Sequence, residues 1–360
     1  MAILFLFIFL VTLYNIKPRI KGFHKDFMDK EQCDAIKGIF IVFVFIRHVL
    51  QYVTKSEYDY NSILDTLGVT INYSLSQLIV VMFLFYSGFG ISESIKKKKE
   101  PYIRRLPVNR IIPTLINFDI AVCWFVVLNL LLGQHLAIQK ILISLTAWDD
   151  VGNSNWYIFI IIVCYLFAYI SYQLSAAFNK ESTPLPLIIQ FLLTLALIFT
   201  LTHFKTSNWY NTVLSFIAGM FLSTYKEKIF SIFKQHYFKL FAITISLFVL
   251  LCLTHKEKFG LKFNMESVLF AFMVVFITMK VKIQNFPLNW LGAHLFPLYI
   301  YQRIPMIALY ELCGQDFIRN HAYLYISLCF AITILIAYLY KFWQVGPLIK
   351  DKKQIIEKMP

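Results

Sequence analysis

The sequence predicts an all-α protein, a polytopic integral membrane bundle of about ten helical spans with a possible extra span at the N-terminus. Hydrophobic residues make up 59% of the 360 residues, charged residues make up only 15%, and the mean hydropathy is +0.65. A soluble domain of this length cannot bury so much apolar surface in one core. Apolar runs of about 20 residues, the length that crosses a bilayer, also recur along the chain. Lipid is therefore the predicted solvent.

Prolines and short polar segments separate these apolar runs. The ten expected spans are 36–53, 75–95, 111–133, 155–178, 185–203, 209–225, 238–254, 264–280, 288–312 and 322–345. The apolar run 2–14 lacks a basic leading region and a small-residue cleavage site, which favours a retained extra span over a cleaved signal peptide. The expected divisions of the chain are 1–30 (apolar segment and basic linker), 31–345 (membrane bundle) and 346–360 (basic tail).

Basic residues orient the bundle. One alternate set of loops carries 23 Lys and Arg residues, and the other set carries 7. By the positive-inside rule the basic set is cytoplasmic, so the span at 36–53 runs from the cytoplasm outwards. Because the net charge of +14 lies mainly in short loops, it indicates topology and contact with membrane lipids rather than nucleic-acid binding. The basic set comprises 15–35, 96–110, 179–184, 226–239, 280–287 and 346–360.

Cysteine usage gives no indication of a metal site. The six cysteines mostly fall inside or beside apolar runs, and no pair has the spacing of metal ligands. They are expected to be small buried hydrophobic residues, and no metal is expected.

Ionisable residues inside the expected spans are the main functional signal, because burial in lipid is costly for each of them. Those near span ends have a simpler explanation: Lys37 can reach the inner surface, and Glu93 and Lys341 can mark it. Glu266 and Glu311 lie near the expected outer surface and have the same simple explanation. The full set is Lys37, Arg47, His48, Glu93, Asp119, Glu266, Arg303, Glu311 and Lys341.

His48 differs because of its neighbours on the same helix. It follows Arg47, and it lies eleven residues after Lys37, which places both side chains on nearly one helical face. At about 1.5 Å per residue, His48 lies roughly 16 Å farther along the helix than Lys37. A cation near the cytoplasm and an imidazole above it could hold an anionic cofactor and act on its far end as a general base. The alternative is a hydrogen-bonded core histidine, and the residues alone leave both interpretations open.

The segment 96–110, KKKKEPYIRRLPVNR, contains seven basic residues among fifteen and is expected to be a cytoplasmic loop. Topology and attraction to anionic lipid explain the Lys run. Arg110 stands directly before the span at 111–133. It is the better candidate for binding phosphate, since a guanidinium is a bidentate donor.

Five stretches resemble motifs of the membrane-bound acyltransferase 3 family. Asp34, Lys37 and His48 are similar to the acidic residue, basic residue and histidine of its first helix, with Lys where Arg is more usual. In order along the chain, the other motif-like stretches are MFLFYSGFG (82–90), RIIP (110–113), NWYIF (155–159) and LGAHLFPLYIYQR (291–303).

The resemblance implies transfer of an acyl group, usually acetyl, from cytoplasmic acetyl-CoA to a hydroxyl group. The implied acceptor is a cell-envelope glycan or a lipid-linked saccharide, and the implied location is the bacterial cytoplasmic (inner) membrane. In this interpretation His48 is a general base or a covalent acyl carrier, and Asp34 holds Lys37 in place.

The resemblance also suggests roles for other residues, with no metal. Those expected to neutralise the phosphates of acyl-CoA are Lys37, Arg104, Arg105 and Arg110. Those expected to line the cavity are Ser87, Trp156, Tyr299, Gln302 and Arg303, although Trp156 is equally well explained as an interfacial anchor.

The sequence departs from the family pattern in three places. Pro107 stands three residues before Arg110, where the family often has Arg, so Arg104 or Arg105 would have to substitute. Gln302 stands where many members have His, which puts the role of that position in doubt. No hydrolase-like domain follows the bundle, so a second transfer step would need a partner or is absent.

Two other classes of protein fit parts of the pattern. A transporter or flippase of lipid-linked saccharides would use the buried charges as a polar path, but it favours broken helices in two corresponding halves, and no such symmetry is evident. A glycan polymerase would have a larger outer loop than 54–74 or 134–154. The sequence leaves open the acceptor, the size of the acyl group and the oligomeric state.

Overall fold

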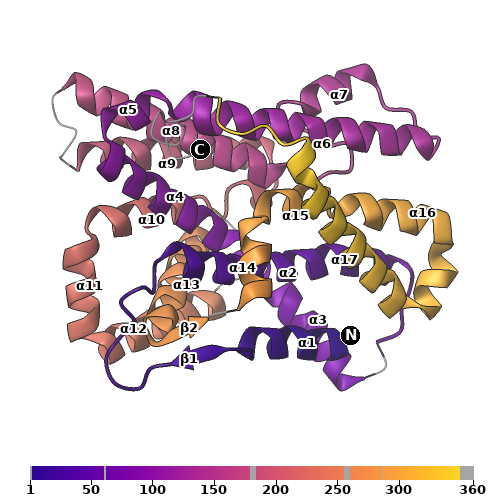
Figure 1. Cartoon of the computed structure of the whole chain (residues 1–360), viewed down its shortest axis with the longest axis horizontal. Coiled ribbons are helices and arrows are strands. Elements are labelled where there is room, and N and C mark those ends of the chain that lie inside the picture. The colour runs from indigo at the N-terminus through magenta and orange to yellow at the C-terminus, as the bar shows by residue number, and fades with distance from the viewer. Residues whose placement is uncertain (1, 61, 179–183, 255–259, 284, 349–360) are drawn as a thin grey trace, which may run out of the picture.

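The computed structural model describes residues 2–60, 62–178, 184–254, 260–283 and 285–348, and Figure 1 shows them as a helical bundle with one small sheet. The α-helices are α1 Ala2–Leu13, α2 Lys30–Lys55, α3 Ile63–Leu75, α4 Leu78–Lys98, α5 Glu100–Arg104, α6 Ile112–Leu131, α7 Ile138–Ser144, α8 Trp156–Ala177, α9 Leu185–Phe204, α10 Leu214–Thr224, α11 Lys226–Gln235, α12 Tyr237–Leu253, α13 Gly260–Lys280, α14 Phe286–Ala293, α15 Leu295–Tyr301, α16 Arg303–Asn320 and α17 Ala322–Leu339. The remaining elements are the π-helix η1 Pro107–Ile111, the 3-10 turns η2 Ser207–Trp209 and η3 Tyr340–Phe342, and the strands β1 Ile16–Pro18 and β2 Val281–Ile283. The expected all-α character is therefore confirmed for the described ranges.

Several of these helices can cross a membrane. By length and composition, six segments qualify among the described residues: α4, η1 with α6, α8, α9, α13, and α17 with η3. The pair α11 and α12 also qualifies if it is counted as one span, although its two helices meet at 98°. The protein is thus a multi-pass membrane protein, while the expected count of about ten spans stays a prediction. Helix α1 covers only about 18 Å, less than the bilayer core of about 30 Å, so the extra N-terminal span also stays a prediction.

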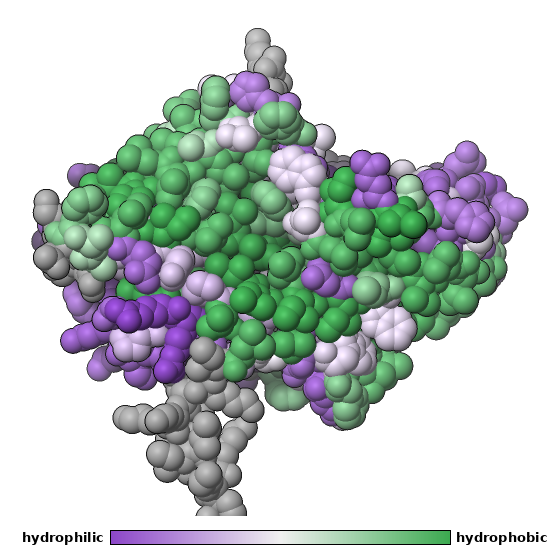
Figure 2. All heavy atoms as spheres, turned by 90° about the horizontal axis from the view of Figure 1, so that it is seen from above, coloured by the Kyte–Doolittle hydropathy of each residue, from purple (hydrophilic) through white to green (hydrophobic). Residues whose placement is uncertain are grey.

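The outside of the bundle is apolar. Figure 2 shows a broad hydrophobic surface with hydrophilic side chains gathered toward its two ends. Large exposed hydrophobic side chains include Trp124 on α6, Phe199 on α9 and Leu247 on α12. A soluble monomer rarely exposes an apolar patch of this size, whereas a membrane protein presents one to lipid.

The tightest helix contacts are made at glycines. A Cβ atom added at Gly38 of α2 would overlap the carbonyl oxygen of Leu288 in α14, and one added at Gly292 of α14 would overlap that of Asp34 in α2. A second pair of helices, α4 and α10, approaches in the same way through Gly88 and Gly219. Small residues let helix backbones approach closely in a membrane, where van der Waals packing drives association.

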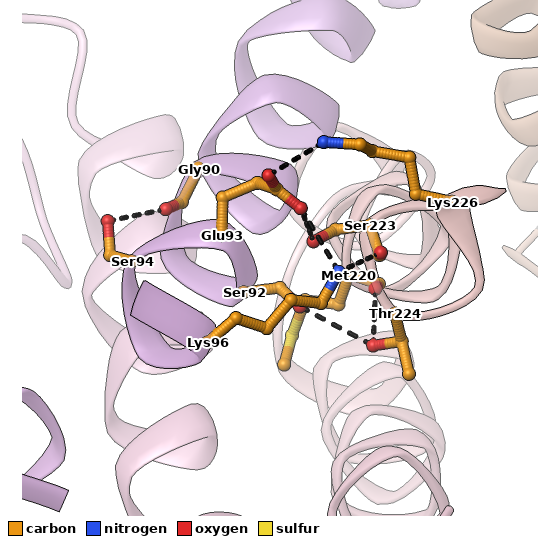
Figure 3. A network of polar contacts seen from close by, with 9 residues as sticks. All are labelled: Gly90, Ser92, Glu93, Ser94, Lys96, Met220, Ser223, Thr224 and Lys226. Carbon is orange, nitrogen blue, oxygen red and sulfur yellow. Dashed lines mark hydrogen bonds and ion pairs between the residues drawn. The ribbon is translucent and has the colours of Figure 1, made fainter. Parts of the chain in front are cut away.

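A polar network at Glu93 adds to the contact between α4 and α10, and it extends to α11 (Figure 3). The Glu93 carboxylate accepts from Ser223 Oγ at 2.7 Å and pairs with the Nζ atoms of Lys96 at 3.1 Å and Lys226 at 3.0 Å. Lys96 also donates to the carbonyl oxygen of Ser223. Glu93 therefore does more than mark the interface.

Two expected segments have a different form in the structure. The expected loop 96–110 is largely helical: α4 continues to Lys98, where Lys residues interact favourably with the carboxyl end of a helix, and α5 and η1 follow. The expected span 288–312 is broken into α14, α15 and the start of α16. Helices α14 and α15 each end four residues before a proline, Pro297 or Pro305, whose ring clashes with the carbonyl group of that earlier residue in a continuous helix.

The segment before α2 is tied to the end of α13. Strands β1 and β2 pair antiparallel, with Lys17 opposite Lys282. Lys282 also forms an ion pair with Asp26. The Gln32 side chain of α2 donates to Val281 O at 3.2 Å and accepts from Ile283 N at 2.9 Å. Residues outside the described ranges include 179–183 of the expected loop 179–184 and 349–360 of the expected tail 346–360.

Replacing Gly88 by Ala should lower the free energy of unfolding by about 1–3 kcal/mol, because the added methyl group overlaps the backbone of Phe216. The matched control is Gly90→Ala on the same helix, where no atom outside the helix lies within 4 Å. Thermal unfolding of the purified variants in detergent measures both. Equal melting temperatures for the two variants would contradict this account of the α4–α10 contact.

The Asp26–Lys282 pair predicts a pH dependence. Its hydrogen bond and charge lower the pKa of Asp26 and raise the pKa of Lys282. The stabilisation should be complete at neutral pH, fade as the pH falls below about 4 through the lowered pKa of Asp26, and fade again above about pH 10.4 through the raised pKa of Lys282. Melting temperatures of the native protein and Asp26→Asn should therefore differ at pH 7 and converge in acid. A constant difference down to the lowest pH would contradict a stabilising role of the Asp26–Lys282 pair.

Candidate functional site

The first turns of helix α2 carry a cationic residue of the candidate site, Lys37. Asp29 caps its N-terminus, where the side chain accepts a hydrogen bond from Gln32 N at 2.8 Å. In the second turn of the helix, Lys37 Nζ pairs with Asp34 Oδ1 at 2.6 Å. Asp34 is buried and Lys37 is partly exposed, so the carboxylate fixes the ammonium group at the edge of the bundle.

His48 lies farther along α2 and is partly exposed. Its Nδ1 atom is buried and has no hydrogen-bond partner in the part of the chain that the structure describes. The guanidinium groups of Arg47 and Arg303 lie near the ring. A buried polar atom without a partner is unusual in a folded protein, and the catalytic role of His48 stays a prediction.

The two arginines beside His48 are held differently. The Arg47 guanidinium lies over the Tyr73 ring of α3, 4.1 Å from its centroid. Arg303 begins α16, directly after the break at Gln302, and its Nη2 atom donates to Gln51 Oε1 of α2 at 2.8 Å. Arg303 Nε is buried and has no hydrogen-bond acceptor within the described ranges. One N–H donor near the imidazole is therefore unused.

The broken segment α15 brings two further predicted residues to this region. Gln302 Nε2 donates to the Tyr299 carbonyl oxygen at 2.9 Å, while Gln302 Oε1 is buried and unpaired among the described residues. The Tyr299 side chain is also buried, and it lies near Arg303 and Ser154. Its ring packs against that of Tyr157 of α8, with centroids 5.1 Å apart.

Hydroxyl groups continue the site from Tyr157 toward the predicted cytoplasmic end. Ser87 of α4 lies beside the hydroxyl groups of Tyr157 and Tyr165. Tyr165 in turn lies close to the guanidinium group of Arg110 in η1, as does Tyr102. Ser87 is partly exposed on a helix whose neighbouring residues are buried, because Gly88 beside it faces α10.

These side chains form one series through the bundle, which we call the polar file. Each member interacts with the following one through its charge, a hydrogen bond or a ring contact, and the members come from η1, α8, α4, α15, α16 and α2. In order they are Arg110, Tyr165, Ser87, Tyr157, Tyr299, Arg303 and His48. Polar groups in a membrane bundle are usually partnered or line a path for solute.

The remaining predicted residues lie at the margins of the polar file. Trp156 packs edge-to-face on Tyr157, with centroids 6.2 Å apart. Arg104 is strongly exposed and pairs with Glu100 at 2.5 Å, so it faces away from Arg110's aromatic neighbours. Arg105 is partly buried. Lys37, paired with Asp34, contacts different groups from Arg110, and the two mark separate cationic positions.

Sequence reasoning named Tyr299 but missed the two other tyrosines of the polar file, Tyr157 and Tyr165, and it also missed Tyr102 beside Arg110. Tyr157 and Tyr165 lie in an apolar run, where an aromatic residue usually indicates packing or an interfacial anchor. Tyr157 could have been suspected, because it follows Trp156 in the NWYIF stretch. No local signal distinguishes Tyr165 from the neighbouring apolar residues of α8. Within the described ranges, no group of three His, Cys, Asp or Glu side chains is placed to hold a metal ion.

A comparison with protein families found a match to an acyltransferase domain model over residues 31–341. The chain belongs to the acyltransferase 3 family. Comparisons with curated proteins and with solved structures found no match. The matched region begins at the second residue of α2 and ends in η3. It therefore contains the whole polar file, whereas α1 and β1 precede it.

Proposed function

We propose that this acyltransferase moves an acyl group, most simply acetyl, from cytoplasmic acetyl-CoA to a hydroxyl group of an envelope glycan or lipid-linked saccharide. The polar file carries the proposal. It has a cation at one end and an imidazole at the other, and an acyl-CoA has anionic phosphates at one end and a thioester at the other. A bacterial inner membrane would give access to both substrates.

The donor would enter from the side of Arg110. A guanidinium binds phosphate oxygens in a bidentate manner, and Arg105 and Lys37 would add positive charge at the same end. Beyond Arg110, the hydroxyl groups of Tyr165, Ser87 and Tyr157 could pair with the amide groups of the pantetheine arm, which would otherwise lose hydrogen bonds inside the membrane. The thioester would then reach Tyr299 and His48.

His48 would act as the general base. It takes the proton of the acceptor hydroxyl as the hydroxyl oxygen attacks the thioester carbon, and the carbonyl oxygen becomes an oxyanion. The unused N–H donor of Arg303 Nε can stabilise that oxyanion. When the intermediate collapses, the carbon–sulfur bond breaks, the CoA thiolate leaves, and the imidazolium of His48 returns the proton to it. In a two-step variant, His48 itself accepts the acyl group and then passes it to the acceptor.

Acetyl-CoA binding to the purified protein, measured by calorimetry, tests the donor assignment. Arg110→Ala should weaken binding about tenfold or more, since hydrogen bonds to charged groups contribute about 1.5–3 kcal/mol. The matched control is Arg19→Ala, because Arg19 is an exposed arginine that donates to Phe23 O and lies outside the polar file. If the native protein bound no acyl-CoA, the saccharide transporter would become the leading interpretation.

His48→Ala should retain acetyl-CoA binding but lose acyl transfer by about 100-fold or more, because general base catalysis contributes about 10²–10⁴ in rate. Transfer of radiolabelled acetyl groups to an envelope glycan fraction gives the rate. His203→Ala is the control, since His203 is exposed at the end of α9 and bonds only to its own helical turn. A His48→Ala protein that still acylates at the native rate would refute the catalytic assignment.

A further inference from the structure

Helix α1, which lies outside the matched acyltransferase domain, forms one wall of a large apolar groove. The groove has a volume of about 750 Å³, and its other walls come from α2, α14 and α17. The α1 residues that line it, Leu4, Phe7, Ile8 and Val11, have the spacing of a single helical face. Asn285 Nδ2 donates to Val11 O at 2.5 Å, which fixes α1 in front of α14.

A second cavity adjoins the groove at Trp290 of α14, which lines both spaces. Ser327, Ala331 and Ile334 line the groove, while Tyr338 and Lys341, one and two turns farther along the chain, line the second cavity, which has a volume of about 470 Å³. These five residues lie three or four positions apart along α17 and its continuation η3, so they share one helical face.

The second cavity differs from the groove in charge. Among the described residues that line it, the charged ones, Lys341 and Arg110, are both cations, and none is acidic. His294 also lines it and stacks on Trp290, with ring centroids 4.2 Å apart. The cavity lies at the ends of η1 and α17 that the basic loops predict to be cytoplasmic. An apolar groove that ends in a cationic cavity is complementary to an amphiphile with an anionic head.

We propose that the groove and the cavity together bind one anionic phospholipid of the inner leaflet. One acyl chain of the lipid occupies the groove between α1 and α17, and its phosphate lies by Lys341 and His294. Apolar burial alone gives little selectivity among lipids inside a bilayer, since every alternative site is also apolar. The cationic end is therefore what selects the anionic headgroup. Arg110 lines this cavity and also belongs to the polar file, so the test has to separate lipid binding from binding of the acyl donor.

The test is lipid binding to the full-length, delipidated protein in non-ionic detergent, followed by native mass spectrometry. The probes are dioleoyl phosphatidylglycerol and dioleoyl phosphatidylcholine, which share their chains and differ in net charge. We expect one tightly held phosphatidylglycerol and weaker binding of phosphatidylcholine. Lys341→Gln should weaken phosphatidylglycerol binding about fivefold and leave phosphatidylcholine binding nearly unchanged.

A second pair of variants tests the groove. Ala331→Trp places a large side chain in the path of the acyl chain and should abolish binding of both lipids. Leu335→Trp is the matched control, because Leu335 is exposed one turn away on α17 and does not line the groove. Melting temperatures of both variants without lipid show that each is folded.

Three outcomes would overturn the proposal. Equal binding of the two lipids would remove the headgroup assignment, and equal effects of Ala331→Trp and Leu335→Trp would remove the groove. Displacement of phosphatidylglycerol by acetyl-CoA would assign the cavity to the acyl donor instead. Failure of acetyl-CoA to bind at all would leave the lipid result intact, so the two proposals are tested separately.

Discussion

The backbone contact between α2 and α14 is the constraint on which the site depends. Gly38 and Gly292 let the two helices meet with no side chain between them. Gly38 directly follows Lys37, and Gly292 rests on the backbone of Asp34, so the contact that packs the helices also orients the ion pair. In a bilayer, where apolar side chains gain little by leaving lipid, such close packing supplies much of the specificity of helix association.

A similar arrangement of a glycine beside a functional residue occurs on α4. Gly88 is held against α10, and the adjacent Ser87 is thereby turned toward Tyr157 and Tyr165. The Glu93 network clamps the same two helices two turns away, with charges that Lys96 and Lys226 balance. Packing and electrostatics thus act on the same pair of helices, and the position of Ser87 follows from both.

Two breaks in the α14–α16 segment supply what straight helices would not. Pro297 and Pro305 interrupt the ladder of backbone hydrogen bonds, and the second break is at Gln302. The turn of the chain there brings Arg303 near both Tyr299 and His48, and it leaves Gln302 Oε1 and Arg303 Nε without partners in the described structure. Unpaired buried groups cost stability, and they persist most often where a ligand completes them.

The sequence by itself determined that the protein lies in a lipid bilayer, that it is helical and which family it resembles. Hydropathy, residue spacing and motif order are properties of the chain that need no tertiary structure. It also placed Lys37 and His48 on one face of α2, which follows from helical geometry. The helix breaks before Pro297 and Pro305 could also have been predicted from the local sequence, but the expected span 288–312 was drawn as one continuous helix. Only the tertiary structure decided that Tyr165 joins the polar file and that α1 closes a groove. Those outcomes depend on which helices touch and at what rotation, and that is set by packing between residues far apart in the chain.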